Sequence, residues 1–323
     1  MKRILITGAD GFLGRSLLRR LAERGGFELL LAQDVRAVPA ERRLPGVQYL
    51  QQDVRDANLR LTLMAERIDT VIHLASIVTP GKDSNRALEY SVDVDGSRNV
   101  LEACVAANVQ HLLVSSSGAA YGYHADNPDW MDESQALRGN ETFAYSHHKR
   151  LVEVMLAEYR ERHPALKQTV FRIGTVLGER VDNQITALFE KSRLIAIRGS
   201  ESPFVFIWDE DVAAAFIHAL DSGIAGCFNL AGDGALGVRE IARRLGKPTL
   251  EFPAALLQMA LWVGSRLGVS RYGPEQLDFL RYRPVLLNTR LKNELGFVPG
   301  KTSEQAFAAF VAARAAQGRP VTA

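Results

Sequence analysis

The chain opens with a short apolar segment that leads directly into three regularly spaced glycines. Residues 4–7 read Ile-Leu-Ile-Thr, and Gly8, Gly11 and Gly14 follow. Leucines recur at helical spacing after the last glycine, which predicts a strand, a turn and a helix in succession. Glycine lets the backbone approach a ligand closely, and a helix N-terminus offers unpaired N–H groups and a positive dipole end. The segment therefore predicts a pyrophosphate-binding turn, although its spacing differs from the common Gly-x-Gly-x-x-Gly pattern of dinucleotide-binding proteins.

Apolar strands alternate with helical patterns through the first half of the chain, which predicts a parallel sheet covered by helices on both faces. The expected strands are residues 3–7, 28–33, 48–51, 70–74, 111–115 and 168–173. The expected helices are residues 12–24, 59–67, 87–107 and 145–162. Six strands in this order are typical of a doubly wound α/β fold, the Rossmann fold, which binds ligands at the carboxyl ends of its strands.

The alternation loosens after residue 174. We expect residues 1–174 to form a dinucleotide-binding Rossmann domain, to which residues 204–232 return. Residues 175–203 and 233–323, which read as mixed helix and loop, are expected to form a smaller, interleaved C-terminal lobe that binds the substrate. No internal repeat or low-complexity linker separates the two parts.

The composition bears on the class of protein. The 323 residues are 47% hydrophobic and 24% charged, with a net charge of +2, which is ordinary for a soluble globular protein. No basic run predicts nucleic-acid binding, and the apolar stretch at residues 254–263 is too short to span a membrane. Cys104 and Cys227 are far apart and show no metal-ligand spacing. We expect a cytoplasmic protein that acts on a small molecule without nucleic acid, membrane or metal.

An acidic residue follows the second expected strand. Asp34 lies twenty residues after Gly14, and a carboxylate at this place accepts hydrogen bonds from the ribose hydroxyls of an adenosine. The same carboxylate repels the 2′-phosphate of NADP, so NAD is the expected cofactor. Arg36 lies two residues further on and softens that preference. Asp53, at the end of the third expected strand, is expected to meet the adenine amino group.

Hydroxyl and amino side chains that suit proton transfer occur in two segments. Tyr145 and Lys149 begin a helix, and residues four apart share a helix face. A neighbouring ammonium favours the phenolate form of tyrosine, which makes Tyr145 a candidate proton donor and acceptor. Ser117 closes a serine run that directly follows an expected strand, at the sheet edge where substrates bind. Each signal alone is weak, because both patterns are common by chance.

Taken together, these segments resemble the extended short-chain dehydrogenase/reductase family, also called the NAD-dependent epimerase/dehydratase family. The resemblance covers most of the chain and depends on the order and intervals of five motifs. They are Thr7-Gly-Ala-Asp-Gly-Phe-Leu-Gly14, Asp69-Thr-Val-Ile-His-Leu-Ala75, Ser115-Ser-Ser-Gly-Ala-Ala-Tyr-Gly122, Tyr145-x-x-x-Lys149 and Trp208-Asp-Glu-Asp-Val-Ala213.

The resemblance implies a hydride-transfer enzyme. Tyr145 would act as the acid and base, Lys149 would hold the nicotinamide ribose, and Ser117 would hydrogen-bond the substrate oxygen. The cofactor-binding residues expected from the motifs are Gly8, Gly11, Phe12, Leu13, Gly14, Asp34, Arg36, Asp53, Val54, Leu74, Ala75, Ser76, Ser115, Tyr145, Lys149 and Ile173. The family also implies a homodimer built from the helices at residues 87–107 and 145–162.

The chain departs from the family pattern at positions that bear on the substrate. Gly118 and Ala119 stand where sugar dehydratases carry an Asp-Glu pair, which disfavours dehydration. Thr175 and Phe204 stand where nucleotide-sugar enzymes tend to carry an asparagine and an arginine that contact the diphosphate. Losing a polar contact and a cation disfavours a diphosphate ligand, although Arg283 remains available for one.

A further departure is Asp93, where the family commonly has asparagine; its role stays open between a proton relay and a structural contact. Other single residues receive structural interpretations. His73 is expected to be a hydrogen-bonded core residue, and His147 and His148 to face solvent or another subunit. Trp130 is a candidate lid residue. In the C-terminal lobe, Leu256, Leu257, Ala260 and Leu261 are expected to form a core stripe, with Met259 and Trp262 as candidate pocket residues.

The expected function is therefore NAD-dependent oxidation of a secondary alcohol, or reduction of the ketone, on a substrate without a nucleotide diphosphate. Two alternatives remain open. The first is a nucleotide-sugar epimerase, which oxidises, rotates and re-reduces its substrate with the same residues. The second is a non-catalytic NAD-binding regulator, against which the presence of Ser117, Tyr145 and Lys149 counts.

Overall fold

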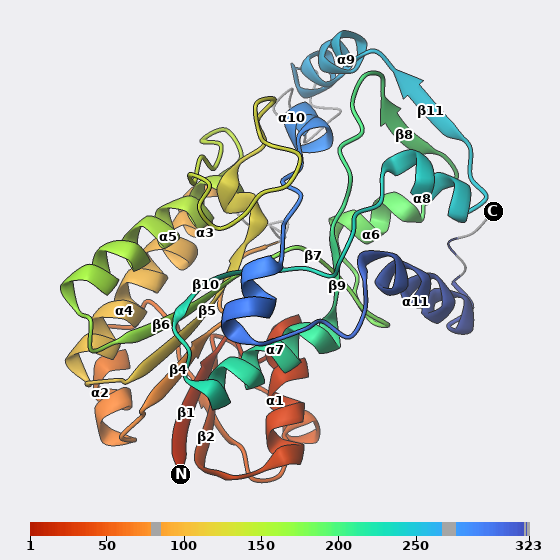
Figure 1. Ribbon diagram of the computed structural model, residues 1–323. Helices are drawn as coiled ribbons and strands as arrows, with labels where there is room; N and C mark the ends of the chain where they lie inside the picture. Colours follow the sequence, from red (N-terminus) through yellow and green to blue (C-terminus); the bar gives the residue numbers. More distant parts are fainter. Residues whose placement is uncertain (79–84, 267–275, 320, 322–323) are drawn as a thin grey trace.

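A parallel sheet of seven strands forms the centre of the protein (Figure 1). The computed structural model describes residues 1–78, 85–266, 276–319 and 321. Neighbouring strands follow the order β10-β6-β5-β4-β1-β2-β3, and every pair is parallel. The strands are β1 (Lys2–Thr7), β2 (Phe27–Asp34), β3 (Gln48–Gln51), β4 (Thr70–His73), β5 (His111–Ser117), β6 (Lys167–Ile173) and β10 (Gly226–Leu230). The expected doubly wound fold is confirmed.

The strand order reverses between β1 and β4, and this reversal fixes where a ligand can bind. Strands β2 and β3 follow one another on one side of β1, and the chain then crosses to β4 on the other side of β1. The connections after β1 and β4 therefore leave the sheet in opposite directions and open a crevice at the carboxyl ends of the strands. Thr7 and His73 pair directly across this reversal.

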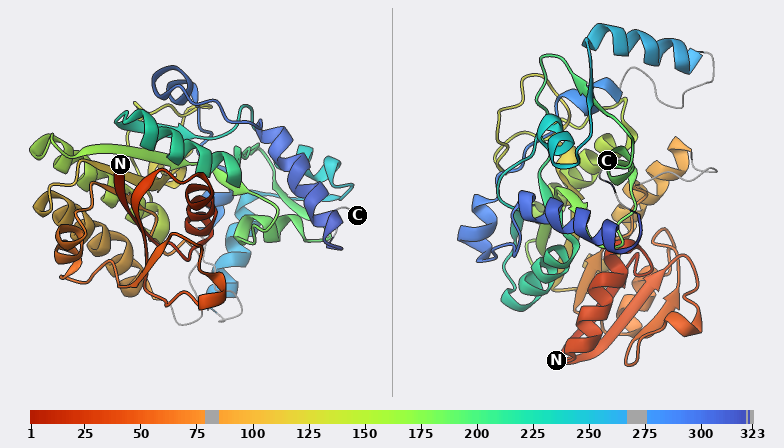
Figure 2. Two further views of the ribbon diagram at one scale, coloured as in Figure 1. Left: turned by 90° about the horizontal axis from the view of Figure 1, so that it is seen from below. Right: turned by 90° about the vertical axis from the view of Figure 1, so that its right-hand side faces the viewer.

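A second group of elements lies beyond the carboxyl ends of the strands (Figures 1 and 2) and is called the lobe. Its strands form two parallel pairs, β7 (Thr175–Leu177) with β9 (Phe206–Trp208) and β8 (Leu194–Ile197) with β11 (Thr249–Phe252). Its helices are α6 (Gln184–Phe189), α8 (Val238–Arg244), α9 (Ala254–Arg266), α10 (Gln276–Arg281) and α11 (Ser303–Ala316). The sequence reasoning missed the β8–β11 pair, which lies outside the strand–helix alternation of the first half of the chain.

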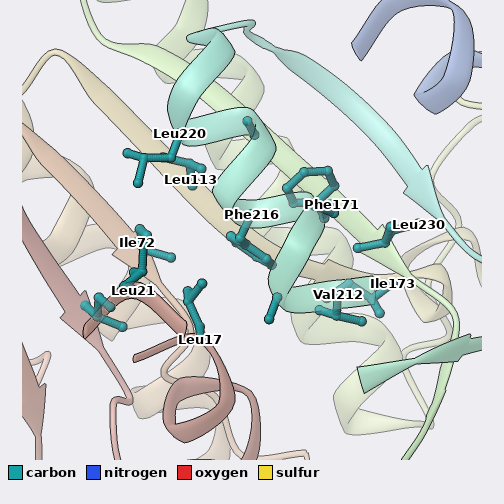
Figure 3. Packing of buried hydrophobic residues seen from close by; sticks show 14 of the residues in the cluster. Leu17, Leu21, Ile72, Leu113, Phe171, Ile173, Val212, Phe216, Leu220 and Leu230 are labelled. Carbon is teal, nitrogen blue, oxygen red and sulfur yellow. The ribbon is translucent and has the colours of Figure 1, made fainter. Parts of the chain in front are cut away.

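Helices cover both faces of the sheet. One face carries α1 (Phe12–Arg24) and α7 (Asp209–Ser222), and the other carries α2 (Leu59–Ala65), α4 (Gly96–Ala106) and α5 (Ala144–Arg162). Figure 3 shows side chains of α1 and α7 directed at those of the sheet strands. This packing anchors α1, whose N-terminus faces the crevice.

The predicted helix at residues 87–107 is not one continuous α-helix. The structure has α3 (Arg86–Tyr90), then a π-helical turn at Ser91–Asp95, then α4. A π-helical turn adds a residue to the helix, rotates the side chains that follow, and is frequent at functional sites. Here the turn directs Asp93 into the protein, where the side chain is 2% exposed.

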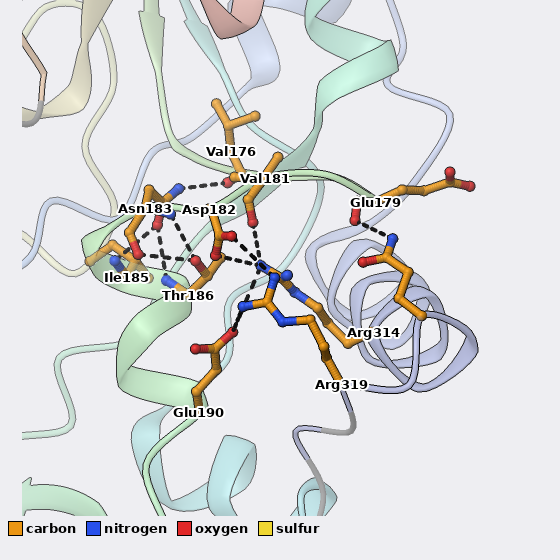
Figure 4. A network of polar contacts seen from close by, with 11 residues as sticks. Val176, Glu179, Val181, Asp182, Asn183, Ile185, Thr186, Glu190, Arg314 and Arg319 are labelled. Carbon is orange, nitrogen blue, oxygen red and sulfur yellow. Dashed lines mark hydrogen bonds and ion pairs between the residues drawn. The ribbon is translucent and has the colours of Figure 1, made fainter.

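Arg314 and Arg319 bind α11 and the residues just after it to the rest of the lobe (Figure 4). The buried Arg314 of α11 donates to the Val181 carbonyl at 2.6 Å and pairs with Asp182 at 2.9 Å. Arg319 pairs with Asp182 and with Glu190, each at 3.2 Å. These contacts tie the end of α11 to α6 and to the loop before it.

The expected core stripe on α9 is wrong for two of its four residues. Leu256 is 47% exposed and Ala260 is exposed, whereas Leu257 and Leu261 are only half-buried. Met259 and Trp262, the candidate pocket residues, are about as exposed as Leu256. The reason is position, because α9 lies at the far end of the lobe (Figure 2) and packs against α10 rather than against the main core.

Candidate active site

The glycine turn between β1 and α1 is shaped by two close approaches of the backbone. Gly8 has a φ of +66°, and a Cβ there would lie 2.7 Å from the Ala75 nitrogen beyond β4. A Cβ on Gly14 would lie 2.3 Å from the Gly8 carbonyl oxygen. Gly11 caps α1 without any side-chain hydrogen bond, so the first-turn N–H groups are free of a side-chain cap. These residues fit the pyrophosphate of a dinucleotide.

Asp34 ends β2 beside this turn and is held by backbone amides. Its Oδ2 accepts the N–H of Asp10 at 2.9 Å, and its Oδ1 accepts the N–H of Arg36 at 3.1 Å. The Arg36 guanidinium lies 3.5 Å from the same carboxylate. The carboxylate is thus fixed at the carboxyl end of β2, where it can accept hydrogen bonds from a ribose.

Two residues near Asp34 escaped the sequence reasoning. The Asp10 carboxylate is buried and accepts two hydrogen bonds from the Arg42 guanidinium, at 2.8 and 3.3 Å. Arg15 lies 3.7 Å from the same carboxylate. Arg42 is 32 residues from its partner, so no local spacing could have revealed the pair.

The other expected cofactor residues lie around the same crevice. Asp53 follows β3, but its carboxylate is taken by Arg55 at 2.6 Å, and that hydrogen bond holds the pKa of Asp53 below its ordinary value. Leu74, Ala75 and Ser76 follow β4 and are partly buried, and the N–H groups of the first two approach Thr7 Oγ1 at 3.3 and 3.4 Å. The remaining members are Phe12 and Leu13 in the first turn of α1, the buried Val54 after β3, Ser115 in β5 and Ile173 at the end of β6.

Ser117, Tyr145 and Lys149 come from two adjoining elements. Ser117 ends β5, and its Oγ accepts the N–H of Ala119 at 3.1 Å. Tyr145 and Lys149 lie on the first two turns of α5, with the Lys149 ammonium 5.6 Å from the centroid of the Tyr145 ring.

Hydrogen bonds fix α5 against the strand that carries Ser117. Lys149 is buried, and its Nζ donates to the Ser115 carbonyl of β5 at 3.0 Å. Ser146 donates to the Ala119 carbonyl at 2.6 Å. Two residues that follow Tyr145 on α5 therefore tie the helix to β5 and to the turn directly after it.

His73 is a hydrogen-bonded core residue, as expected. Its Nδ1 lies 2.7 Å from Thr7 Oγ1 and its Nε2 lies 3.0 Å from Ser97 Oγ. Ser97 donates its hydrogen to the Asp93 carbonyl at 2.5 Å, so Nε2 carries the ring proton and Nδ1 accepts from Thr7. Burial and the charge of Lys149 lower the pKa of His73 to about 3, which keeps the ring neutral at pH 7.

His148 is buried within its own chain, so the expectation that it faces solvent or another subunit is wrong. The residue is 1% exposed, and its Nδ1 lies 3.2 Å from Asp93 Oδ2. The ring also meets the edge of Tyr90 at a centroid distance of 5.5 Å. The sequence does not show which of His147 and His148 points inward. That depends on Asp93, which the π-helical turn at Ser91–Asp95 directs towards His148.

A buried ion pair supports the strand ends. Glu153 of α5 and Arg172 of β6 meet at 2.7 Å with both side chains buried. Arg172 also donates to the Tyr121 hydroxyl at 2.8 Å, and Ser116 donates to Glu153 at 2.5 Å. Burial raises the pKa of Tyr121, so the hydroxyl stays protonated. This network holds β5, β6 and α5 together directly beneath the catalytic candidates.

The side of the crevice that faces the lobe is aromatic. Tyr123, Phe143 and Phe279 form a mutual cluster with centroid distances of 5.2 to 5.7 Å. The Arg283 guanidinium lies 3.8 Å from the Phe204 ring and 5.3 Å from the Phe279 ring. Its Nη1 donates to the Ser202 carbonyl at 2.8 Å.

Arg283 is a charged group with one unsatisfied atom. Its Nε is buried without a hydrogen-bond partner, and no carboxylate within the described ranges forms an ion pair with it. Burial lowers the pKa of Arg283 to about 9, which still leaves the guanidinium charged at pH 7.

The site has little room for additional acidic groups next to Ser117. A Cβ on Gly118 would lie 3.0 Å from Leu286 Cδ2, and Ala119 is buried.

No group of three His, Cys, Asp or Glu side chains is arranged to hold a metal in the part of the chain that the structure describes. Within the same part, no helix has the length and apolar character needed to cross a membrane.

Comparisons with known proteins show which family the chain belongs to. The family model described as NAD dependent epimerase/dehydratase family matches residues 4–231. An uncharacterized protein of Mycobacterium tuberculosis is 25% identical over 313 residues, which cover 95% of this chain and 82% of that protein. A UDP-glucose 4-epimerase of Erwinia amylovora is 30% identical over 190 residues, which cover 56% of each chain.

Solved structures share the fold over the whole chain. The UDP-glucose 4-epimerase of Thermotoga maritima with UDP-glucose superposes with a TM-score of 0.73 at 20% identity, covering 98% of this chain and 99% of that one. The Bordetella bronchiseptica enzyme WbmG in complex with NAD and UDP gives 0.74 at 21% identity, covering 99% and 95%. The chain belongs to the NAD-dependent epimerase/dehydratase family of enzymes.

Proposed function

We propose that the protein binds NAD and transfers hydride to or from a secondary alcohol or ketone, using Ser117, Tyr145 and Lys149. The observation that carries the proposal is the approach of the Lys149 ammonium to the Tyr145 ring, at 5.6 Å, on a helix bonded to the serine strand. NAD, when bound, supplies the hydride acceptor or donor. The glycine turn and Asp34 are the residues that would hold it.

Tyr145 takes the proton of the substrate hydroxyl in oxidation and returns it in reduction. The positive charge of Lys149 favours the phenolate form that accepts this proton. Ser117 Oγ already accepts the N–H of Ala119, which leaves its own hydrogen free to donate. That hydrogen stabilises negative charge on the substrate oxygen as the carbon–oxygen bond changes order.

We further propose that the substrate lacks a nucleotide diphosphate. The Phe204 ring packs on one face of the Arg283 guanidinium, and the Ser202 carbonyl accepts a hydrogen bond from its Nη1. The aromatic cluster of Tyr123, Phe143 and Phe279 favours an apolar group close to Tyr145. The crowding at Gly118 and Ala119 argues against the acidic pair that a dehydratase needs.

One observation favours the second candidate, a nucleotide-sugar epimerase. Arg283 is charged, and its buried Nε has no partner among the described residues, so an anionic group of a substrate would satisfy it. An epimerase uses the same tyrosine, lysine and serine, and its product forms without net reduction of NAD.

Two assays separate the candidates. The protein is incubated with NAD⁺ and a panel of secondary alcohols while absorbance at 340 nm is followed, and in parallel with UDP- and GDP-sugars whose epimers are resolved by chromatography. We expect NADH formation with alcohols. Epimerised sugar without NADH formation would replace the first candidate by the second, and the Tyr145→Phe variant must be inactive in either case.

A further inference from the structure

Asp93 is a buried carboxylate close to the proposed proton-transfer residues but outside their set. Its side chain is 2% exposed, and both oxygens are engaged: Oδ1 accepts the N–H of Ile77 at 2.9 Å and Oδ2 lies 3.2 Å from His148 Nδ1. A buried carboxylate is costly unless it is hydrogen-bonded and paired with positive charge. Lys149, the residue after His148 on α5, supplies that charge.

The charge state of Asp93 follows from these contacts. Burial raises the pKa of the carboxyl, but the hydrogen bond from His148 and the charge of Lys149 outweigh burial and hold the pKa below its ordinary value. Asp93 is therefore an anion at pH 7. No carboxylate lies within ion-pair distance of Lys149 in the described ranges, so the ammonium is balanced at longer range by Asp93.

We propose that Asp93 and His148 form a positioning pair that balances the charge of Lys149 and thereby sets the pH at which Tyr145 gives up its proton. His148 donates its Nδ1 hydrogen to the carboxylate, and Lys149, the next residue on α5, places its ammonium at the Ser115 carbonyl. This inference rests on the proposed function, because it assigns the pair a role in tuning Tyr145. Neither residue is proposed to touch the substrate.

The groups around the pair come from each neighbouring element. His73 of β4 is neutral and connects to the Asp93 carbonyl through Ser97. The rings of Tyr90 on α3 and His148 meet edge to face. His147 directly precedes His148 on α5. Because His73 is neutral at pH 7, the charges that bear on the pair are those of Asp93 itself and of Lys149.

The effect of removing the negative charge has a definite sign. A carboxylate near Lys149 cancels part of the positive potential that favours the Tyr145 phenolate. Asp93→Asn keeps the shape and removes the charge, so phenolate should form at lower pH. We expect the Asp93→Asn midpoint to lie below that of the unmodified protein. Asp95→Asn is the matched control, since Asp95 lies on the same π-helical turn and is exposed.

Two variants of His148 test the other member of the pair. His148→Leu removes the donor, so that the buried carboxylate takes up a proton and loses its charge; this should move the midpoint in the same direction as Asp93→Asn. His148→Asn retains a side-chain N–H donor and should leave the midpoint near that of the unmodified protein. The Asp93→Asn/His148→Leu double variant should shift no further than Asp93→Asn alone, because both changes remove one charge.

The experiment is a spectrophotometric titration of the full chain. Absorbance at 295 nm is followed from pH 6 to 10, and the trace of a matching variant that also carries Tyr145→Phe is subtracted, which isolates Tyr145. Circular dichroism and NADH affinity verify that each variant is folded.

The outcomes separate the two levels of the argument. A Tyr145 signal that shifts in Asp93→Asn and His148→Leu but not in Asp95→Asn supports the inference. A signal that stays in place in Asp93→Asn overturns the inference alone, and one that shifts in Asp93→Asn but not in His148→Leu overturns the role of His148. Absence of any Tyr145 signal in the unmodified protein overturns the proposed function together with the inference.

Discussion

Replacing Gly14 by alanine should lower the free energy of unfolding even without a cofactor. The added Cβ would lie 2.3 Å from the Gly8 carbonyl oxygen and 2.7 Å from the Ala9 carbonyl oxygen. Both neighbours are backbone atoms of the turn itself, so they cannot rotate away as a side chain would. The turn must shift by several tenths of an ångström or more, and overpacking of this kind costs about 1–3 kcal/mol.

Gly11→Ala is the matched control within the same turn. Its Cβ would meet one atom, the Gly8 carbonyl oxygen, at 3.0 Å, and otherwise open space. The free energy of unfolding should fall by less than about 1 kcal/mol, since the loss is limited to that contact and a poorer helix cap. The methyl group would nevertheless stand where the pyrophosphate is expected, so NADH affinity should fall at least tenfold, or about 1.4 kcal/mol.

Urea unfolding followed by circular dichroism measures the first effect, and calorimetric titration with NADH measures the second. We expect Gly14→Ala to lose both stability and affinity, and Gly11→Ala to lose affinity with little loss of stability. A Gly14→Ala variant as stable as the unmodified protein would refute the crowding argument. A Gly11→Ala variant with full NADH affinity would refute the placement of the pyrophosphate.

Two further predictions concern buried charge. Glu153→Gln leaves the Arg172 guanidinium buried without its carboxylate and should lower the free energy of unfolding by about 3–5 kcal/mol. The control is Glu158→Gln, which breaks an exposed pair with Arg162. It should lower the free energy of unfolding by less than about 1 kcal/mol in the same urea assay. The pKa of His73 is lowered to about 3 by burial and by Lys149, so between that value and about 6.5 the unfolded chain binds a proton that the folded chain does not. Stability should therefore fall as the pH falls from about 6.5 towards 3, and a urea midpoint unchanged between pH 7 and pH 4.5 would contradict this.

The sheet could be predicted because its central strands are buried on both faces. Such strands contain short uninterrupted apolar runs, such as Ile4 to Ile6 in β1 and Leu112 to Val114 in β5. The β8–β11 pair could not, since it lies outside the strand–helix alternation and β11 is only partly buried. The expected stripe on α9 failed for a related reason, because helical periodicity shows that a face is apolar but not whether another element covers it.

The candidate site divides in the same way. Motif spacing places Gly8, Gly14, Tyr145 and Lys149 because each pair is close in the sequence. Contacts between distant segments, such as Asp10 with Arg42, leave no local pattern.

The contact between Asp93 and His148 depended on a π-helical turn that periodicity does not reveal. A helix predicted as continuous over residues 87–107 gave no sign that Asp93 turns inward. Its partner on α5 was therefore assigned to the surface.

The central claim is that Tyr145 exchanges a proton with the substrate while hydride moves to or from NAD. The most direct test compares the unmodified protein with Tyr145→Phe, measuring NADH formation at 340 nm with the best secondary alcohol of the panel and NADH affinity by calorimetry. The account predicts that turnover falls at least about 100-fold, the usual size of a general acid–base contribution, while NADH affinity stays within about twofold. Unchanged turnover in the Tyr145→Phe variant, with intact NADH binding, would contradict it.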